Sequence, residues 1–302
     1  MKKRILALGL TVALAAASLA ACGGASTKTT EKVTEAGTEQ GSEKATEAAK
    51  EEKADAGELR TYKLGVNGSD HEEWEKANEL LAKDNIKVEM VEFSDYVKPN
   101  EALEDGEIDL NAFQTEIYFN NFVKERGYTD LGILAYTQVA PMGIYSSKYK
   151  SLDEATGHLI IAIPNDVTNG GRALKFLEKN GFLTLKKEAG LTPTVMDIEK
   201  YNKDVEIVEM VATQIPASLP DLSFACINNG VAKDAGLTLK NDAIVYEDYK
   251  EPDMKNYWNI IAAKKDRIES EDFQKIKKAY NSDEVKQVVL EHYDGQSIPV
   301  WD

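Results

Sequence analysis

Cysteine is almost missing from this chain of 302 residues, which holds only Cys22 and Cys226. Cys226 is the single cysteine in the part of the chain that carries the fold, so an internal disulfide is excluded there. The run around it, LSFACINN, is largely apolar. Such a setting predicts a cysteine that packs as a small hydrophobic side chain.

Histidine is also scarce, with His71, His158 and His292 as the full set. None lies in a strand-end loop that also holds a serine in a nucleophile-elbow setting, so the sequence argues against a catalytic triad. His71 precedes Glu72 and Glu73, but side chains at neighbouring helix positions point in different directions. A single histidine is also too few for a typical transition-metal site. We therefore expect a protein that is not an enzyme and has no metal site and no cofactor.

Positive charge is in deficit, because 36 Lys and Arg face 52 Asp and Glu and the formal net charge is −16. This balance argues against nucleic acid and against an anionic membrane surface as partners. The glycine-containing stretch 163–174 is not a phosphate loop, since it has neither the Lys-Ser/Thr of that motif nor the G-x-G-x-x-G spacing. A small ligand responds to local charge alone, so this class remains open.

Residues 1–21 predict an export signal, with a basic start, MKKR, and an apolar run too short and too small for a comfortable membrane span. The sequence LAAC before two glycines matches a bacterial lipobox, in which the cysteine is lipidated and becomes the mature N-terminus. We predict lipidation of Cys22. The alternative is an ordinary signal peptide that contains a cysteine.

Residues 22–57 have no aromatic side chain and are rich in Thr, Glu, Ala and Lys. Such a segment buries too little apolar surface to offset its ordering entropy, so we expect a disordered tether rather than a stable helix. Lipidated Cys22 and this tether predict a protein at the cell membrane, lipid-anchored on the extracytoplasmic face.

The remaining residues, 58–302, alternate strand-like and helix-like segments and predict an α/β fold with parallel sheets covered by helices on both faces. The expected strands are YKLGV, KVEMVEF, IDLNAF, HLIIAIP, EIVEMVA and FACIN. The expected helices are DHEEWEKANELLAKDN, NEALEDG ending at Gly106, TEIYFNNFVKER ending at Gly127, GRALKFLEKN and SEDFQKIKKAYNSDEVKQVVLEHY. In such folds ligands bind at the carboxyl ends of strands.

One strand-to-helix junction, IPNDVTNGGRAL at 163–174, has the character of an anion site. Thr168 or Asn169 is a good helix N-cap, and a helix N-terminus favours an anion. Gly170 and Gly171 would let the backbone approach a ligand closely.

Arg172 lies in the first turn of this helix, where its planar fork suits a carboxylate. An equally open interpretation is a structural ion pair of Arg172 with Asp166 or Asp109.

Several ordered motifs give the chain a family resemblance: FSDYVKPNEAL, GEIDLNAFQ, IPNDVTNGGRAL, SDEVK and the closing PVW. The chain resembles the methionine-binding lipoproteins, which are solute receptors of bacterial methionine importers. The resemblance implies a two-lobed periplasmic-binding-protein fold, type II-like, with the ligand cleft between the lobes. Lobe 1 would span 58–145 plus 247–302, and lobe 2 would span 146–246.

The resemblance also implies ligand-binding residues. These are Tyr96 lining the cleft, Phe113 and Tyr118 as aromatic walls, Arg172 as the carboxylate clamp, and Asn228 and Asn259 as amide partners of the polar end. The chain departs from the family at Thr115 and Ile117, where a histidine and a proline are usual, and at Gly230 and Val231, where an aromatic residue is common. These departures leave the clamp intact and affect the slot for the ligand side chain, of which Thr115 is a part.

By this resemblance the protein is a monomeric, lipid-anchored receptor of an ABC importer. It would capture methionine or a closely related amino acid and deliver it to a permease with its ATPase. Two alternatives stay open: a different apolar amino acid or a methionine-containing dipeptide as the ligand, or a structural lipoprotein without a transport role.

Overall fold

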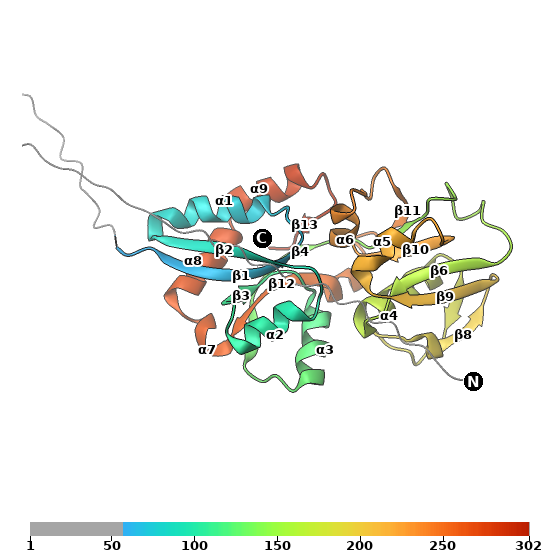
Figure 1. Ribbon diagram of the computed structural model, residues 1–302, viewed down its shortest axis with the longest axis horizontal. Helices are drawn as coiled ribbons and strands as arrows, with labels where there is room; N and C mark the ends of the chain where they lie inside the picture. The colour runs from blue at the N-terminus through green and yellow to red at the C-terminus, as the bar shows by residue number, and fades with distance from the viewer. Residues whose placement is uncertain (1–56, 302) are drawn as a thin grey trace, which may run out of the picture. The chain divides into compact units, whose positions relative to one another are not determined.

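Residues 57–301 are the part of the chain described by the computed structural model in Figure 1. The predicted signal peptide, Cys22 and all but the last residue of the predicted tether lie outside the described residues. Among the helices of residues 57–301, none has the length and apolarity needed to cross a bilayer.

The first sheet contains six of the described strands and mixes parallel and antiparallel pairs. Strand β1 pairs in parallel with β2 and β3, whereas β12 runs antiparallel to both β3 and β4. In sheet order the strands are β13 (Ile298–Pro299), β4 (Leu131–Val139), β12 (Trp258–Lys264), β3 (Leu110–Asn111), β1 (Arg60–Asn67) and β2 (Ile86–Phe93).

The second sheet contains five of the described strands and again has a parallel part and an antiparallel part. Strand β6 pairs in parallel with β9 and β10, and β5 runs antiparallel to β10 and β11. In sheet order the strands are β11 (Ala243–Tyr246), β5 (Gly143–Tyr145), β10 (Phe224–Ile227), β6 (Leu159–Pro164) and β9 (Val205–Met210). A separate hairpin pairs β7 (Leu183–Leu185) with β8 (Ile198–Tyr201).

Two features of the sheets differ from the sequence prediction. Parallel sheets were expected and both sheets are mixed, because β4, β5, β11 and β12 run against their neighbours. The paired strands β4 and β12 were not predicted at all. Their apolar runs are short, and a short apolar run cannot be assigned to strand or buried helix by periodicity alone.

Helices cover both faces of the first sheet (Figure 1). One face packs against α1 (Glu72–Leu81), α8 (Glu271–Tyr280) and α9 (Asp283–His292), and the rings of Trp74 and Tyr280 are 4.6 Å apart there. The other face packs against α2 (Lys98–Asp105) and α3 (Glu116–Arg126), which end at Gly106 and Gly127 as predicted. The short helices η1 (Ala82–Asp84) and α7 (Lys265–Ile268) connect neighbouring elements.

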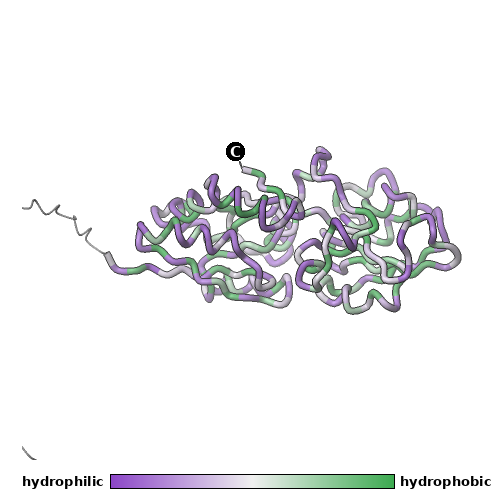
Figure 2. Tube along the Cα trace, turned by 90° about the horizontal axis from the view of Figure 1, so that it is seen from above, coloured by the Kyte–Doolittle hydropathy of each residue, from purple (hydrophilic) through white to green (hydrophobic). Residues whose placement is uncertain are grey.

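The second sheet is covered in the same way. Helix α4 (Val167–Lys179) packs with Phe182 and Phe224 on one face, and α5 (Ile215–Ser218) and α6 (Asn229–Asp234) pack on the other. Cys226 is fully buried in β10, as predicted for a hydrophobic role. Figure 2 shows hydrophobic segments running through the interior around both sheets. The short helices η2 (Val195–Asp197) and η3 (Ala212–Gln214) precede β8 and α5.

The chain passes between the two sheets twice within the described residues. The first passage, at 140–142, joins β4 to β5, and the second joins β11 to β12 through the 3₁₀ helix η4 (Pro252–Tyr257). The lobe boundaries predicted from the sequence stay a proposal. Strand β5 pairs within the second sheet, which favours a boundary just before Gly143 rather than after residue 145.

Candidate functional site: a cavity between the two sheets

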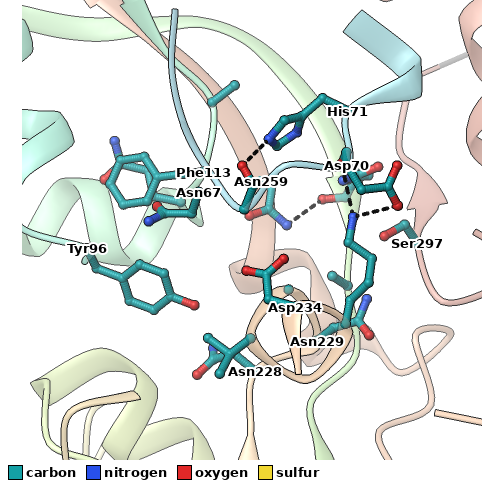
Figure 3. Close-up of a pocket in the computed structure, with 18 of the residues that line it drawn as sticks. Asn67, Asp70, His71, Tyr96, Phe113, Asn228, Asn229, Asp234, Asn259 and Ser297 are labelled. Atoms are coloured by element: carbon teal, nitrogen blue, oxygen red, sulfur yellow. Dashed lines mark hydrogen bonds and ion pairs between the residues drawn. The ribbon is translucent and has the colours of Figure 1, made fainter. Parts of the chain in front are cut away.

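A cavity of about 660 Å³ lies between the two sheets, at the carboxyl ends of strands β1, β2 and β10 (Figure 3). Its position is the one expected for a ligand site in an α/β fold. All seven side chains that the family resemblance indicates line this cavity: Tyr96, Phe113, Thr115, Tyr118, Arg172, Asn228 and Asn259. Tertiary folding therefore brings together residues that are up to 163 positions apart in the sequence.

Three aromatic rings form one wall of the cavity, which we call the aromatic wall. The ring centroids of Tyr96 and Phe113 are 6.0 Å apart, and Tyr118 lies 6.1 Å from Tyr96 and 6.2 Å from Phe113. The hydroxyl of Tyr118 donates to the carbonyl of Tyr96 at 2.9 Å, which holds the two rings together. Burial raises the pKa of Tyr96 and of Tyr118, so both phenols are neutral at physiological pH.

Thr115 has a local structural role at the edge of the aromatic wall. It is the N-cap of α3, and its hydroxyl accepts a hydrogen bond from the backbone N–H of Tyr118 at 3.3 Å. Its backbone also forms an isolated antiparallel bridge with Asn259. Thr115 therefore helps to position two other cavity residues, in addition to setting the size of the slot.

Arg172 is nearly fully buried, with 3% of its surface exposed. Its Nε donates to Glu247 at 3.0 Å, and its Nη2 donates to Glu247 at 2.5 Å and to the carbonyl of Ala140 at 2.9 Å. The guanidinium carbon also lies 4.3 Å from the ring centroid of Tyr257. Among the described residues, Nη1 has no protein acceptor, so it is the guanidinium nitrogen that remains open to a ligand.

These contacts identify the carboxylate that pairs with Arg172. The partner is Glu247 and neither of the two considered from the sequence: Asp109 pairs with Arg267 at 2.5 Å, and Asp166 caps α4. Arg172 is thus a structural ion-pair residue that also lines the cavity. The two interpretations left open by the sequence are compatible, because a guanidinium has more donors than one carboxylate can use.

The start of α4 differs from the prediction. Its N-cap is Asp166, whose carboxylate accepts from the backbone N–H of Asn169 at 2.9 Å and from the hydroxyl of Thr168 at 2.9 Å. The expectation of Thr168 or Asn169 as the N-cap was wrong. Because an ionised carboxylate accepts several hydrogen bonds, Asp166 can hold both residues and start the helix earlier.

The glycine pair serves the protein's own packing. A Cβ atom on Gly170 would lie 2.7 Å from the carbonyl oxygen of Pro164, and one on Gly171 would lie 2.8 Å from the Cα of Thr192. The expectation that these glycines admit a ligand was wrong. Gly170 lets α4 pack closely against the end of β6, and Gly171 lets it pack against the backbone at Thr192.

The cavity amides belong to fixed hydrogen-bond chains. Asn228 donates to Asn169 at 2.8 Å, and Asn169 donates to Asp166 at 3.0 Å. Asn259 donates to the backbone carbonyl of Gln138 at 3.1 Å. Since these contacts use the NH₂ groups, they orient the amides and leave the carbonyl oxygens directed elsewhere.

Four buried amide oxygens around the cavity accept no hydrogen bond from the described residues. They are Asn67 Oδ1, Gln138 Oε1, Asn228 Oδ1 and Asn229 Oδ1. A buried acceptor without a donor costs about 1–3 kcal/mol. Because these four oxygens have almost no accessible surface themselves, they do not on their own form a binding surface for a ligand.

The site has little that suggests catalysis. The thiol of Cys226 is enclosed in β10, and burial raises its pKa, so it is not a nucleophile. Asp70, Glu72 and His292 place possible metal-ligating atoms within 4.8 Å of one another. His292 Nε2 already lies 2.7 Å from Asp70 Oδ1, so a hydrogen bond between these two side chains brings them together.

Two cavity features were missed at the sequence level. Glu247, the partner of Arg172, follows directly after β11, so recognising that strand would have drawn attention to it. Asp234 ends α6 and lines the cavity, and no local sequence pattern marks it. Asn67, in contrast, is the last residue of β1 and Asn229 lies two residues after β10, at the carboxyl ends of strands where the sequence predicts ligand binding.

The chain is similar to known lipoproteins and binding proteins. The family model described as NlpA lipoprotein matches residues 62–301. The D-methionine-binding lipoprotein MetQ of Escherichia coli K12 is 40% identical over 243 residues, which are 79% of this chain and 88% of that protein.

Solved structures agree. A nutrient-binding protein from Burkholderia cenocepacia, solved with methionine bound, is 36% identical, has a TM-score of 0.75, and covers 80% of this chain and 100% of its own. The substrate-binding protein of a methionine transporter from Streptococcus pneumoniae is 37% identical, with a TM-score of 0.75, and covers 80% and 96% of the two chains.

These relatives confirm the predicted periplasmic-binding-protein fold, and they are binding proteins rather than enzymes, as expected from the sequence. The match of the family model to nearly all of the described residues also confirms the resemblance read from the motifs. The chain belongs to the NlpA lipoprotein family.

Proposed function

We propose that this protein is the substrate-binding receptor of an ABC importer and that it captures methionine or a closely related amino acid. The observation that carries the proposal is the composition of one cavity. The aromatic wall enters it from the elements of the first sheet, and Arg172 enters it from α4 beside the second. An apolar slot next to a cationic end suits an amino acid with an apolar side chain.

The aromatic wall would take the ligand side chain. A thioether sulfur is polarisable and packs favourably against aromatic rings, so methionine is the leading candidate for a slot formed by Tyr96, Phe113 and Tyr118. The aromatic rings are already in mutual contact, so little further ordering would be needed on binding.

Arg172 would hold the ligand carboxylate through Nη1, the nitrogen that Glu247 and Ala140 leave free. The ion pair with Glu247 fixes the plane of the guanidinium in advance. Asn228 and Asn259 are positioned by their own hydrogen bonds and would complete the polar end of the site. A charge-assisted contact in a buried site is stronger than a neutral one, which favours a ligand with a carboxylate.

Residues outside the described region complete the proposal. Lipidated Cys22 would anchor the protein on the extracytoplasmic face of the cell membrane, and the receptor would act there as a monomer that delivers its ligand to a permease with its ATPase. Several acyl chains anchor a lipoprotein firmly in the membrane, whereas a single chain binds only weakly. The net charge of −16 argues against nucleic acid as a partner.

A different ligand is the second candidate, and the small residues Thr115, Gly230 and Val231 at the cavity favour it. They leave space where bulkier side chains are usual in the family. Another apolar amino acid or a methionine-containing dipeptide would use the same carboxylate contact and fill more of the cavity.

Mass spectrometry of ligand released from freshly purified protein, followed by calorimetry, tests both candidates. We expect methionine to bind more tightly than the other nineteen amino acids and than methionine-containing dipeptides. Tighter binding of another amino acid or a dipeptide would replace methionine and keep the receptor role. If no compound with an α-carboxylate stabilises the protein in a thermal-shift screen, a structural lipoprotein is the better interpretation.

A further inference from the structure

Asp234 is a carboxylate in the cavity that the site described above does not use. It ends α6, beside the second sheet, and its side chain points into the cavity (Figure 3). Its oxygens reach the loop after β1, because a Cβ atom on Gly68 would lie 2.4 Å from Asp234 Oδ1. The carboxylate therefore lies where elements of the two sheets meet.

This carboxylate has no partner among residues 57–301. No hydrogen bond or ion pair reaches Asp234, although Lys233 is its neighbour in the chain. The Lys233 ammonium is already engaged elsewhere: it donates to the backbone carbonyl of Asp70 at 3.1 Å, pairs with the Asp70 carboxylate at 3.4 Å, and lies 4.5 Å from the ring centroid of Tyr293. Desolvation raises the pKa of the Asp234 carboxyl, and the positive charges of Lys233 and His71 oppose this shift without reversing it.

Two cationic side chains at the cavity already have carboxylate partners. Glu247 neutralises Arg172, and Asp70 neutralises Lys233. Asp234 has no ion-pair partner of its own among the described residues. Asp234 is exposed to solvent within the cavity, so its carboxylate, which has no protein partner in residues 57–301, is free to pair with a cationic donor group of a ligand that binds there.

An α-amino acid carries such a group, because its ammonium has three donors and a positive charge. We propose that Asp234 is the counter-ion of the ligand ammonium and thereby selects zwitterionic ligands over simple carboxylic acids. This inference rests on the proposed function and names the residue that would recognise the second charge of the ligand. Arg172 and Asp234 would then divide the head group, with the carboxylate at one residue and the ammonium at the other.

A competing role for Asp234 is a contact between α6 and the loop at Gly68 that does not involve the ligand. The two roles differ in what they do to ligands without an ammonium. A counter-ion matters only for a ligand that carries the positive charge. A contact between elements supports the cavity as a whole and matters equally for every ligand.

The test compares methionine with 4-(methylthio)butanoic acid, which keeps the thioether and the carboxylate and lacks the ammonium. Calorimetry with the wild-type protein, Asp234→Asn and Asp221→Asn gives the affinity ratio of the two ligands for each. Asp221 is an exposed carboxylate outside the cavity and controls for the loss of one negative charge. A thermal melt of each variant verifies that it is folded.

We expect Asp234→Asn to lower the ratio by about tenfold, through weaker binding of methionine and unchanged binding of the analogue. Asp221→Asn should leave the ratio as it is in the wild type. An unchanged ratio in Asp234→Asn overturns the inference, whether the two affinities fall together or neither falls. Failure of the proposed function is seen separately, because the wild-type protein would then bind neither methionine nor any other amino acid.

Discussion

Arg172 and Glu247 form a buried ion pair, with Nη2 of the guanidinium 2.5 Å from Oε2 of the carboxylate. Glu247 also accepts a hydrogen bond from the backbone N–H of Met142 at 2.7 Å, and Arg172 donates to the carbonyl of Ala140. Residues 140–142 and 247 belong to the two passages of the chain between the sheets. The ion pair therefore ties the proposed carboxylate clamp to both passages.

Loss of Glu247 should destabilise the protein. Glu247→Gln leaves the buried guanidinium without a counter-charge, and we expect a loss of about 3–5 kcal/mol in the free energy of unfolding, measured by urea denaturation. Glu251→Gln is the matched control, because Glu251 pairs with Lys179 at the surface. The control should cost less than about 1 kcal/mol. Equal losses of unfolding free energy in the two variants would show that the buried pair contributes no more to stability than the surface pair.

Replacement of both partners separates the structural role of Arg172 from its role in binding. Arg172→Leu alone leaves the buried carboxylate of Glu247 without a counter-charge, whereas the double variant Arg172→Leu, Glu247→Leu removes both charges. We expect the double variant to be more stable than either single variant and still to lose about 2–5 kcal/mol of methionine affinity, measured by calorimetry. Recovery of affinity together with stability would mean that Arg172 acts through folding alone.

The aromatic wall should contribute mainly to binding. Phe113→Ala removes a ring that contacts Tyr96 and Tyr118, and we expect methionine binding to weaken by about 1–3 kcal/mol. Phe113→Leu keeps apolar volume and should lose less. Tyr201→Ala removes an exposed aromatic residue on β8 and should leave the affinity unchanged. Calorimetry measures the methionine affinity of the three variants. A larger loss of affinity in Phe113→Leu than in Phe113→Ala would argue against a role of the Phe113 ring in ligand binding.

Stability should decrease in acid through Asp272. The hydrogen bond from Arg60 holds the pKa of this carboxyl below its usual range, with a further one from Tyr62. A carboxyl whose pKa is lowered on folding adds stability above its unfolded pKa of about 3.9, and this stability is lost as the pH falls through the folded pKa.

Urea denaturation from pH 6 down to pH 3 measures this contribution. The unfolding free energy of Asp272→Asn should fall less steeply than that of the wild type below about pH 4. Parallel curves for the two proteins would assign the acid sensitivity to other groups.

Membrane attachment should depend on Cys22. Cys22→Ser removes the site of lipidation, and we expect the protein to move from the membrane fraction to the soluble fraction, as followed by immunoblotting of fractionated cells. Cys226→Ala changes the other cysteine, which is buried in β10, and should leave the protein with the membrane. Membrane retention of Cys22→Ser would rule out the lipid anchor.

Local patterns were enough to predict much of this protein. Strands β1, β2, β6, β9 and β10, and helices α2 and α3 with their ends at Gly106 and Gly127, follow from periodicity and from glycine at helix ends. The family motifs located seven of the residues that line the cavity. Such features depend on neighbours a few positions away, so the sequence displays them directly.

The partners of the functional groups could be decided only by the tertiary structure. Arg172 and Glu247 are 75 positions apart, and several carboxylates in the chain could have paired with the arginine. The contact of Asp234 with Gly68 and the close approach of Thr192 to Gly171 likewise join segments without any common local pattern. The pairing of β4 with β12, which makes the first sheet mixed, has the same origin. Each depends on how two sheets and their helices pack around shared cores, and that packing selects one partner among many that are chemically equivalent.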